Sequence, residues 1–460
     1  ANPTDGPQAP GDRMAERRPA GRSRLRGARH PDFAGGVSAP LHFDLWLPPF
    51  RLEAGSMLPH LYLRGWWWGP AEERPGLVAG VVPAAHAPGA VVVRDVERQD
   101  VLRRETDALR AEPALGADVP TVIVVHALTA DAVLAGDDGW WAPLVGPGCA
   151  LDPETTRILC FNNLGSCYGS FGPVDPGFPT AGDELSAEST IDLPPDAHPE
   201  KGWFDLPPEH PGTITTWDQA RAIWRALDRL GIEQVEMVTG GSLGGMIAFA
   251  MAMLAPRRIR TLAPIAASTA ATPWVQGWNH AGRAAILADP GFPDGAGRGL
   301  EIARQIAHMT YRAEPGLVER QSPAAVAPSA AHPLPIQTYL EHQGKKLRGR
   351  FHARAYLAQL TAMDRHDILR PPPEPEPEHA EAWTAGAEWT LDRITSRIRA
   401  IGIDSDQLYF PTHLRALVDD FAERDRDAKY LEIRSPHGHD AFLIEWDQME
   451  RALRWALEGA

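Results

Sequence analysis

The chain has 460 residues with 43% hydrophobic content, enough to bury one large core or two ordinary ones, and its formal net charge is −15. That charge gives no global positive field for a polyanion, so nucleic acid and anionic membrane are poor candidate partners, although a locally basic pocket could hold a small anion. The three cysteines show no metal-binding spacing and fit a reducing cytosol, and no apolar run reaches the length of about 18 residues that a membrane span needs. We expect a cytoplasmic globular protein with no metal site.

Two segments have a biased composition. Residues 1–40 carry seven arginines among Pro, Gly and Ala and have no apolar stretch, which predicts a disordered Arg-rich arm. A targeting or nucleic-acid tail is the alternative, but the arginine-rich stretch lacks aromatic residues and the rest of the chain is acidic. The stretch RPPPEPEPEHAEA at 370–382 cannot continue a helix, so we expect an exposed acidic spacer there.

Strand and helix patterns alternate between these two segments, which is typical of a mostly parallel sheet covered by helices. Buried strands are predicted at 121–128 and 157–164. The spacing of apolar residues predicts a helix over 215–232. A short strand over 234–240 then runs into a glycine-rich turn, and a helix over 243–256 follows until a proline stops it.

The turn between that strand and that helix contains a G-x-S-x-G pattern formed by Gly240, Ser242 and Gly244. A strand-to-helix turn this tight strains the central backbone and leaves no room for side chains at the flanking positions. Ser242 Oγ would then project above the sheet as a nucleophile, and the N–H of Leu243, at the helix N-terminus, would face developing negative charge. The alternative interpretation is a flexible glycine-rich turn with an incidental serine.

A serine nucleophile needs a base and an orienting acid, which on such a fold follow in the order Ser, Asp or Glu, His. Asp404 and Asp406 directly follow one apolar strand near the C-terminus, and His437 and His439 follow the next. Loops at the carboxyl ends of parallel strands are where open α/β sheets build their sites. The pattern favours catalysis over turn capping or packing, but it does not choose within either pair.

Eight blocks of the sequence occur in the order found in one enzyme family. They are HALTA (126–130), GWWAPLVGPGCALD (139–152), FNNLGSCYGSFGP (161–173), GGSLGGM (240–246), IARQIAHMTYR (302–312), YLEHQGKKLRGRFHARAYLAQLTAMDRHDI (339–368), GIDSDQLYFP (402–411) and GHDAFL (438–443). The chain thereby resembles the homoserine O-acyltransferase (homoserine O-acetyltransferase) family of the α/β-hydrolase superfamily over most of residues 120 to 445. Unrelated hydrolases share only the serine turn.

The resemblance implies an α/β-hydrolase fold with a mostly parallel central sheet and an inserted helical lid. After the arm at 1–40, the first part of the core would span 41–270 and the second part 391–460. The lid would span 271–390, with the acidic Pro-rich spacer at 370–382 inside it. In the family the lid also carries a homodimer contact, so we expect a homodimer formed through it.

The resemblance also assigns the reacting groups. The implied triad is Ser242, Asp406 and His439, with Asp406 in the S-D-x-L element and His439 in the G-H-D element. Leu128, in the H-A-L-T element, would supply the second backbone N–H of the oxyanion hole beside Leu243.

Three further residues would hold an amino-acid substrate by the same resemblance: Arg304, Tyr311 and Asp440. Their chemistry agrees with this role, because a guanidinium suits a carboxylate and a carboxylate suits an ammonium group. Arg304 and Tyr311 are two helical turns apart, so both fall on one helix face. Taken without the resemblance, Arg304 could be a solvated helix charge and Asp440 a loop cap.

The implied activity is an acyl-CoA-dependent O-acyltransferase that acts on the hydroxyl of an amino acid by a ping-pong route through an acyl-serine. L-homoserine O-acetyltransferase, in methionine biosynthesis, is the favoured member, with acetyl-CoA as co-substrate and no bound cofactor. Serine O-acetyl- or succinyltransferase, homoserine O-succinyltransferase, an acyltransferase acting on a secondary-metabolite alcohol, and an esterase with the same triad are the alternatives. A non-catalytic binding protein is disfavoured because every triad residue is present.

The chain departs from the family pattern in four places. Residues 66–120 replace a short edge hairpin, and Phe171 stands where a small hydroxyl residue is usual. The segment 289–300 lacks an expected aromatic residue, and the spacer at 370–382 is additional. We expect these changes near the acyl and acceptor pockets, so they leave the acyl donor and the acceptor alcohol open.

Overall fold

The structure is a computed structural model that describes the greater part of the chain. Most of the expected Arg-rich arm, most of the 66–120 segment and nearly all of the 370–382 spacer lie outside the described residues. Within the described part, no helix is both long and apolar enough to cross a membrane. The described residues are 40–58, 61–70, 81–83, 119–136, 139–175, 213–292, 295–322, 333–372 and 389–458.

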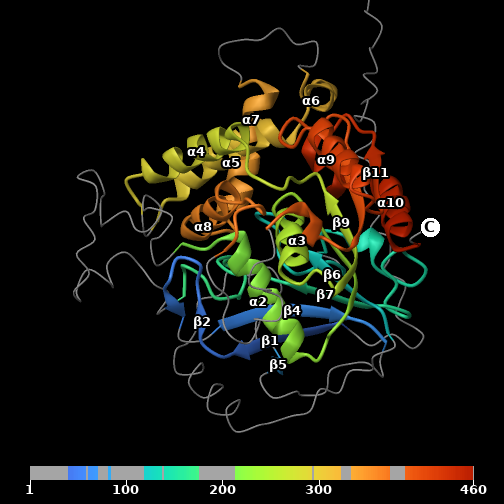
Figure 1. Cartoon of the computed structure of the whole chain (residues 1–460). Helices are drawn as coiled ribbons and strands as arrows, with labels where there is room; N and C mark the ends of the chain where they lie inside the picture. The colour runs from blue at the N-terminus through green and yellow to red at the C-terminus, as the bar shows by residue number, and fades with distance from the viewer. Residues whose placement is uncertain are drawn as a thin grey trace, which may run out of the picture.

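Nine strands of the described residues form one sheet in the order β11-β10-β9-β8-β6-β7-β4-β1-β5 (Figure 1). The run from β11 to β7 is parallel, whereas β4, β1 and β5 pair antiparallel at one edge, so the prediction of a mostly parallel sheet is confirmed. The strands are β1 (Leu41–Leu47), β4 (Leu61–Trp68), β5 (Val81–Pro83), β6 (Thr121–Val125), β7 (Arg157–Phe161), β8 (Val235–Gly241), β9 (Ile259–Ile265), β10 (Arg397–Ile403) and β11 (Ala428–Ile433), with a separate pair β2 (Phe50–Arg51) and β3 (Met57–Leu58).

One expectation about this edge is wrong. The segment 66–120 was expected to replace an edge hairpin from its first residue, but its first three residues are tryptophans that complete β4, where Trp67 pairs with Leu41 on one side and Leu159 on the other. The strand lies between two neighbours and is buried along nearly its whole length, which explains its continuous apolar run. Gly65 lets the rings of its neighbours approach, because a Cβ there would lie 2.8 Å from Phe43.

Helices cover both faces of the sheet, as the alternation of side chains along its strands requires. In β6, Ile123 and Val125 pack in one core cluster with residues of α2, α3 and α9, whereas Val122 and Val124 pack in a second cluster with α10. In the described part of the chain, the helices outside the β9–β10 connection are α2 (Thr216–Arg229), α3 (Leu243–Leu254), α9 (Pro411–Glu423) and α10 (Trp446–Glu458). Short 3₁₀ turns span Ala142–Leu144 and Gly438–Leu443, and a third, Leu391–Arg393, lies just before β10.

Helix α2 shows how local sequence sets these boundaries. Thr215 caps its N-terminus by accepting a hydrogen bond from Asp218 N, while the Asp218 carboxylate accepts one from Thr215 N at 3.0 Å. This reciprocal capping satisfies backbone donors that a helix start leaves unpaired. Gly231 follows the last turn with φ of 72°, a left-handed conformation that glycine adopts without strain. The predicted helix is therefore confirmed.

Within the described residues, five helices lie between β9 and β10 in the sequence. Figure 1 shows α4, α5, α6 and α7 gathered above the sheet, on the side away from β1, β4 and β5. Helix α5 packs against both α4 and α7. All five fall within the expected 271–390 segment, but their action as a lid stays a prediction. They are α4 (Pro273–Leu287), α5 (Gly297–Tyr311), α6 (Glu314–Gln321), α7 (Pro335–Arg348) and α8 (Ala353–Asp364).

Candidate active site

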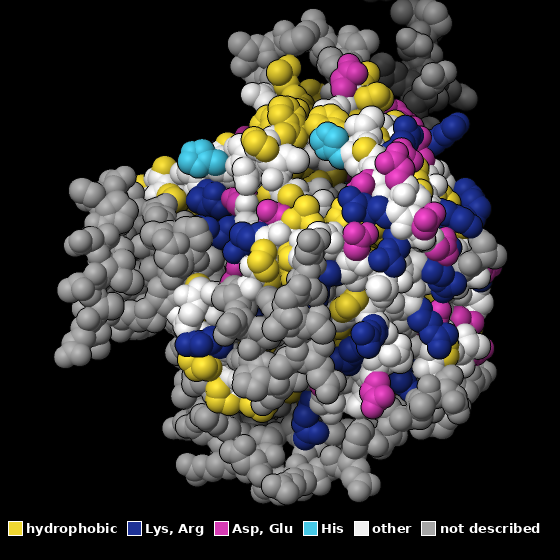
Figure 2. All heavy atoms as spheres, viewed as in Figure 1, with side chains coloured by type: hydrophobic (Ala, Val, Ile, Leu, Met, Phe, Trp, Pro, Cys, Tyr) yellow, Lys and Arg dark blue, Asp and Glu magenta, His cyan; other side chains and the backbone are white. Residues whose placement is uncertain are grey.

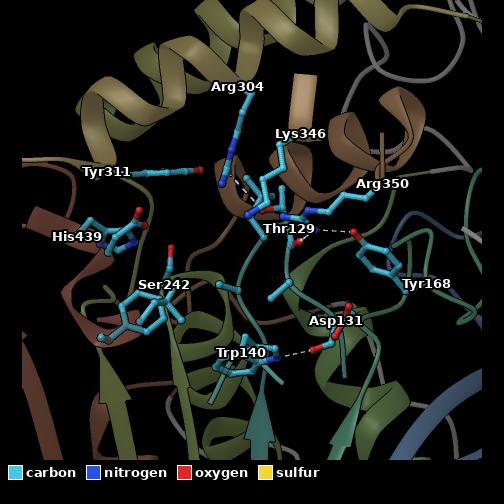
Figure 3. Close-up of a pocket in the computed structure, with 16 residues that line it drawn as sticks. Thr129, Asp131, Trp140, Tyr168, Ser242, Arg304, Tyr311, Lys346, Arg350 and His439 are labelled. Carbon is cyan, nitrogen blue, oxygen red and sulfur yellow. Dashed lines mark hydrogen bonds between the residues drawn. The ribbon is translucent and has the colours of Figure 1, made fainter. Parts of the chain in front are cut away.

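Ser242 occupies a strained turn between β8 and α3. Its φ and ψ are 58° and −123°, and its N–H donates to Ile265 O of β9 at 2.9 Å. Neither flanking glycine can be replaced without a collision, since a Cβ at Gly240 or Gly244 would lie 2.4 or 2.1 Å from Val125 O. Strain of this kind persists only where the surrounding structure fixes it. The turn is thus rigid and aims the serine hydroxyl into a cavity (Figure 3).

Asp406 and His439, which follow Ser242 in the chain, form a buried pair. His439 Nδ1–H donates to Asp406 Oδ2 at 2.7 Å, and both side chains are almost fully buried. Asp406 Oδ1 in turn accepts the N–H groups of Leu408 and Tyr409 at 2.8 and 2.9 Å, which fixes the carboxylate from its other side. An imidazole held at Nδ1 keeps Nε2 free to exchange a proton with a nucleophile.

The two residues that the sequence left as alternatives lie elsewhere. Asp404 Oδ1 accepts a hydrogen bond from Ser435 N at 2.9 Å, which ties one loop to the next. His437 Nε2 lies 3.2 Å from Arg320 Nη2 at an exposed position. Neither side chain lines the cavity that Ser242 and His439 share. The geometry therefore favours Asp406 over Asp404 and His439 over His437.

The protonation of His439 is set by opposing effects. Burial alone would lower its pKa, but the charge and hydrogen bond of Asp406, with a smaller contribution from Asp440, raise the pKa above the usual 6.5. The ring is also enclosed by aromatic side chains. The ring centroids of Tyr409 and Tyr311 lie 5.3 and 5.8 Å from that of His439. These contacts hold the imidazole in one orientation beside Ser242.

The loop after β6 brings Leu128 to the other side of the serine. Ala130 N donates to Ala127 O at 3.1 Å, so Leu128 and Thr129 are the central residues of a tight turn. His126 anchors the start of this turn, because its Nε2 accepts the Asn163 N–H at 2.9 Å and its Nδ1–H donates to Ala127 O at 2.8 Å. Burial lowers the pKa of His126 to about 4, so the ring is neutral at neutral pH, as this bonding pattern requires.

A cavity of about 580 Å³ joins these groups (Figure 3). Six of the eight residues singled out from the sequence line it, while Asp406 lies behind His439 and Leu243 follows Ser242 at the start of α3. The lining residues are Ala127, Leu128, Thr129, Ala130, Asp131, Trp140, Tyr168, Ser242, Arg304, Tyr311, Lys346, Arg350, His439, Asp440, Phe442 and Leu443.

Of the residues expected to hold an amino acid, Arg304 and Tyr311 come from α5 of the inserted segment, and Asp440 follows His439 in the turn after β11. Arg304 hangs from α5 toward Thr129, whose hydroxyl accepts a hydrogen bond from Nη1 at 3.4 Å (Figure 3). The guanidinium lies 5.3 Å from the ring centroid of Tyr311, so the two side chains share one helix face as predicted. Asp440 lines the same space, and its Oδ2 forms an ion pair of 3.2 Å with Arg312. A cation and a carboxylate thus flank the serine.

Sequence reasoning missed part of this lining, above all Lys346 and Arg350. Both belong to the quoted block GKKLRGRF, but only Lys346 lies in α7, which ends at Arg348, so helical spacing does not relate the two. The described residues of the departures from the family pattern lie outside the cavity lining. Phe171 is buried in the core cluster, and neither it nor any described residue of the other three segments lines the cavity. The expectation that they lie at the pockets is therefore not met by the described residues.

Among the described residues, no group of three or more His, Cys, Asp or Glu side chains is arranged to hold a metal ion. The arrangement at Ser242 instead combines a serine hydroxyl on a rigid turn, an imidazole oriented by a carboxylate, and backbone N–H groups at a helix start. Such a set can form and break an ester at the serine oxygen.

Fold and site together define an α/β hydrolase, and residues 120–445 match the family described as the alpha/beta hydrolase fold. A homoserine O-acetyltransferase of Thermus thermophilus is 39% identical over 354 residues, which cover 72% of this chain and 80% of the relative. The chain belongs to the homoserine O-acetyltransferase family and is an enzyme of the O-acyltransferase class.

Solved structures share this fold. The homoserine O-acetyltransferase from Bacillus anthracis has a TM-score of 0.65 at 16% identity, with 91% of this chain and 98% of that chain covered. The acetyl esterase MekB has a TM-score of 0.59, also at 16% identity, with 92% and 97% covered. At these identities the likeness extends to the fold and does not separate a transferase from an esterase.

Proposed function

We propose that the protein transfers an acyl group from acyl-CoA to the hydroxyl of an α-amino acid, with acetyl-CoA and L-homoserine as the favoured pair. The observation that carries this proposal is the cavity at Ser242, which combines the buried His439–Asp406 pair with Arg304 and Asp440. Relatives named homoserine O-acetyltransferase support the same assignment. Acylation of homoserine belongs to methionine biosynthesis, and a cytoplasmic location remains an expectation from the sequence.

The first half-reaction acylates the serine. Nε2 of His439 accepts the proton of Ser242 as Oγ attacks the thioester carbonyl, and the imidazolium is stabilised by Asp406. The negative charge on the carbonyl oxygen faces the backbone N–H groups of Leu128 and Leu243, the second of which opens α3. The C–S bond then breaks, and His439 returns the proton to the departing CoA sulfur. An acyl-serine and free CoA result.

The second half-reaction moves the acyl group to the acceptor. His439 takes the proton of the acceptor hydroxyl, whose oxygen attacks the acyl-serine carbonyl. The bond to Ser242 Oγ breaks and the serine regains its proton from His439. These steps use only groups of the chain, with acyl-CoA as a co-substrate.

Recognition of the acceptor follows from the charges around the serine. Arg304 offers a guanidinium to the α-carboxylate, Tyr311 lies beside it, and Asp440 offers a carboxylate to the ammonium group. Asp440 already pairs with Arg312, but a carboxylate has acceptor sites for both partners. An amino-acid alcohol therefore satisfies the cavity better than a neutral alcohol or water.

Transfer must compete with hydrolysis of the acyl-serine. Positioning the acceptor can lower the barrier by several kcal/mol, provided that bulk water is kept from the site. Residues of the inserted segment, among them Arg304 and Lys346, line the cavity, which supports a role in excluding water. In this sense we propose that the inserted segment acts as a lid.

A substrate panel tests the proposed function. Acetyl-, propionyl- and succinyl-CoA are each combined with L-homoserine, L-serine or no acceptor, and thiol release is followed. We expect the fastest release with acetyl-CoA and homoserine, and only slow release without acceptor. Equal release with and without an amino acid would identify an esterase, whereas a preference for serine or succinyl-CoA would reassign the substrate within the transferases.

We also propose that the chain forms a homodimer through the inserted segment. Figure 2 shows hydrophobic side chains gathered over these upper helices. Ile302 and Met309 of α5 are 37% and 42% exposed, and Val318 of α6 is 53% exposed. Contiguous patches of exposed apolar side chains mark interaction surfaces. Sedimentation should give a dimer that Met309→Glu weakens, while Met57→Glu, similarly exposed on β3, leaves it intact. A monomeric native protein would refute the proposal.

A further inference from the structure

Arg350 connects the inserted segment to the loop that carries Leu128. It follows α7, and its Nη1 donates to Thr129 O at 2.5 Å and to the Tyr168 hydroxyl at 2.6 Å. Figure 3 shows the side chain extended toward Thr129, with the Tyr168 hydroxyl close to its end. Both partners belong to the α/β core and are at least 90% buried. The contact therefore crosses from one part of the molecule to the other next to the candidate oxyanion hole.

The rest of this loop is held from within the core. At its start His126 bonds to Ala127 O, and at its end Asn162 Oδ1 accepts the Ala132 N–H at 2.8 Å. Trp140 Nε1 donates to Asp131 O at 2.8 Å. The carbonyl of Thr129, one residue after Leu128, is bonded by Arg350. The middle of the loop is thus bonded by Arg350, a side chain from outside the core, whereas the two ends of the loop are held by residues of the core itself.

Two features suit an arginine to this task. One guanidinium nitrogen carries two hydrogens in fixed directions, so Nη1 can serve the carbonyl and the phenol together. Among the described residues no carboxylate forms an ion pair with Arg350, so its positive charge is directed at the turn itself. Thr129 is also the residue whose hydroxyl meets Arg304, which brings the acceptor side of the cavity to the same turn.

We propose that Arg350 is a positioning residue that fixes the Leu128–Thr129 turn and thereby the oxyanion hole. This inference rests on the proposed function, because it assumes that Ser242 is acylated. Docking of the inserted segment then completes the site for acylation, in addition to covering it. Arg350 touches neither the serine nor the acyl group in this role.

The test compares Arg350→Met, Arg350→Lys and Tyr168→Phe with the native enzyme. The matched control is Arg348→Met, two residues away, which removes an exposed arginine paired with Glu301. Acylation of Ser242 by p-nitrophenyl acetate is measured, since this reaction needs the oxyanion hole but neither CoA nor an amino acid. Affinity for an alkylboronic acid, which adds to the serine oxygen and mimics the tetrahedral intermediate, is the second readout.

We expect Arg350→Met to slow acylation by about 10-fold or more, below the roughly 10²–10³ lost when an oxyanion donor itself is removed. Boronate affinity should fall in parallel while KM for acetyl-CoA stays near the native value, a split that a general loss of structure would not give. Arg350→Lys should recover part of the rate. Tyr168→Phe removes only the hydroxyl that Arg350 contacts and should show a smaller loss of the same kind, so it tests the proposal even if Arg350→Met does not fold.

Two results separate the possible failures. If the native enzyme forms no acyl-Ser242, the proposed function fails. If the native enzyme is acylated and the folded Arg350 and Tyr168 variants react and bind boronate as it does, the positioning role alone is overturned.

Discussion

The Nδ1–H of His439 donates a 2.7 Å hydrogen bond to Asp406 Oδ2, although 33 positions separate the two residues. β10 and β11 are parallel neighbours, so the loops after their carboxyl ends meet at one edge of the sheet. Ser242 reaches the same edge from β8, two strands away. Sheet order, rather than closeness in sequence, thus assembles the candidate triad.

The pH dependence of acylation should follow His439. Its pKa is raised, and only the neutral imidazole can accept the serine proton, so the rate should rise with pH through a midpoint above 6.5. The protonated His439 paired with Asp406 stabilises the fold at pH values below the pKa of the imidazole in the unfolded chain. This stabilisation is lost as the pH rises through the raised pKa of the folded state. Asp440→Asn removes one charge that raises this pKa and should move the midpoint to lower pH. Acylation by p-nitrophenyl acetate at a series of pH values measures it, with Asp404→Asn as the control that should cause no shift.

His439 and Ser242 should act as one unit. His439→Ala alone is expected to lower turnover by on the order of 10³-fold or more, and adding Ser242→Ala should cost far less than the product of the two losses. Steady-state rates of the two single variants and the double variant give the comparison. His437→Ala should be mild, because its side chain lies outside the cavity. A severe effect of His437→Ala with a mild effect of His439→Ala would reverse the assignment.

Two glycines should respond to alanine in opposite ways. Gly244→Ala would place a Cβ 2.1 Å from Val125 O in a buried turn, so we expect a loss of roughly 3 kcal/mol or more in unfolding free energy. Gly277 lies exposed within α4, where an added Cβ would meet no neighbouring atom within 4 Å, and Gly277→Ala should stabilise by about 0.5–1 kcal/mol. Urea unfolding measures both, and a tolerated Gly244→Ala would mean that the turn is not tightly packed.

Much of the fold could be predicted because it is encoded locally. The strand over 234–240, the helix after it and the strained serine follow from apolar spacing and from glycines that alone fit the turn. The choice of Asp406 over Asp404 could not be made from the residues, since both follow the same strand. It depends on a loop conformation in which Leu408 and Tyr409 donate to one carboxylate.

The contacts that cross the cavity were beyond sequence reasoning for a different reason. Arg350 and Thr129 are 221 positions apart, and their contact exists only after the inserted segment docks on the core. The sequence shows a cluster of basic residues around Lys346 and Arg350, but it cannot say which part of the core that cluster contacts. The tryptophans at the start of the 66–120 segment were not predicted as a strand because a strand buried between two neighbours shows no alternation of polar and apolar residues.

Arg304→Ala should separate the two half-reactions. Acyl-CoA does not need the guanidinium, so the burst of CoA release should stay normal, whereas transfer to homoserine should slow by an amount equivalent to about 2–4 kcal/mol. Rapid-quench kinetics should show an acyl-enzyme that is discharged only by slow hydrolysis. Arg298→Ala, an exposed arginine on the same helix, is the control. Unchanged transfer in Arg304→Ala would mean that the acceptor binds elsewhere or is not an amino acid.

The acyl-enzyme itself is the most direct test. The native protein is mixed with acetyl-CoA alone, and intact mass followed by peptide mapping locates any acetyl group. We predict one acetyl group per chain on Ser242, none on the Ser242→Ala variant, and discharge that is much faster with L-homoserine than with water. The proposal would be contradicted if Ser242→Ala retained a tenth of the native turnover, or if no acetyl group accumulated on Ser242 while CoA was still released.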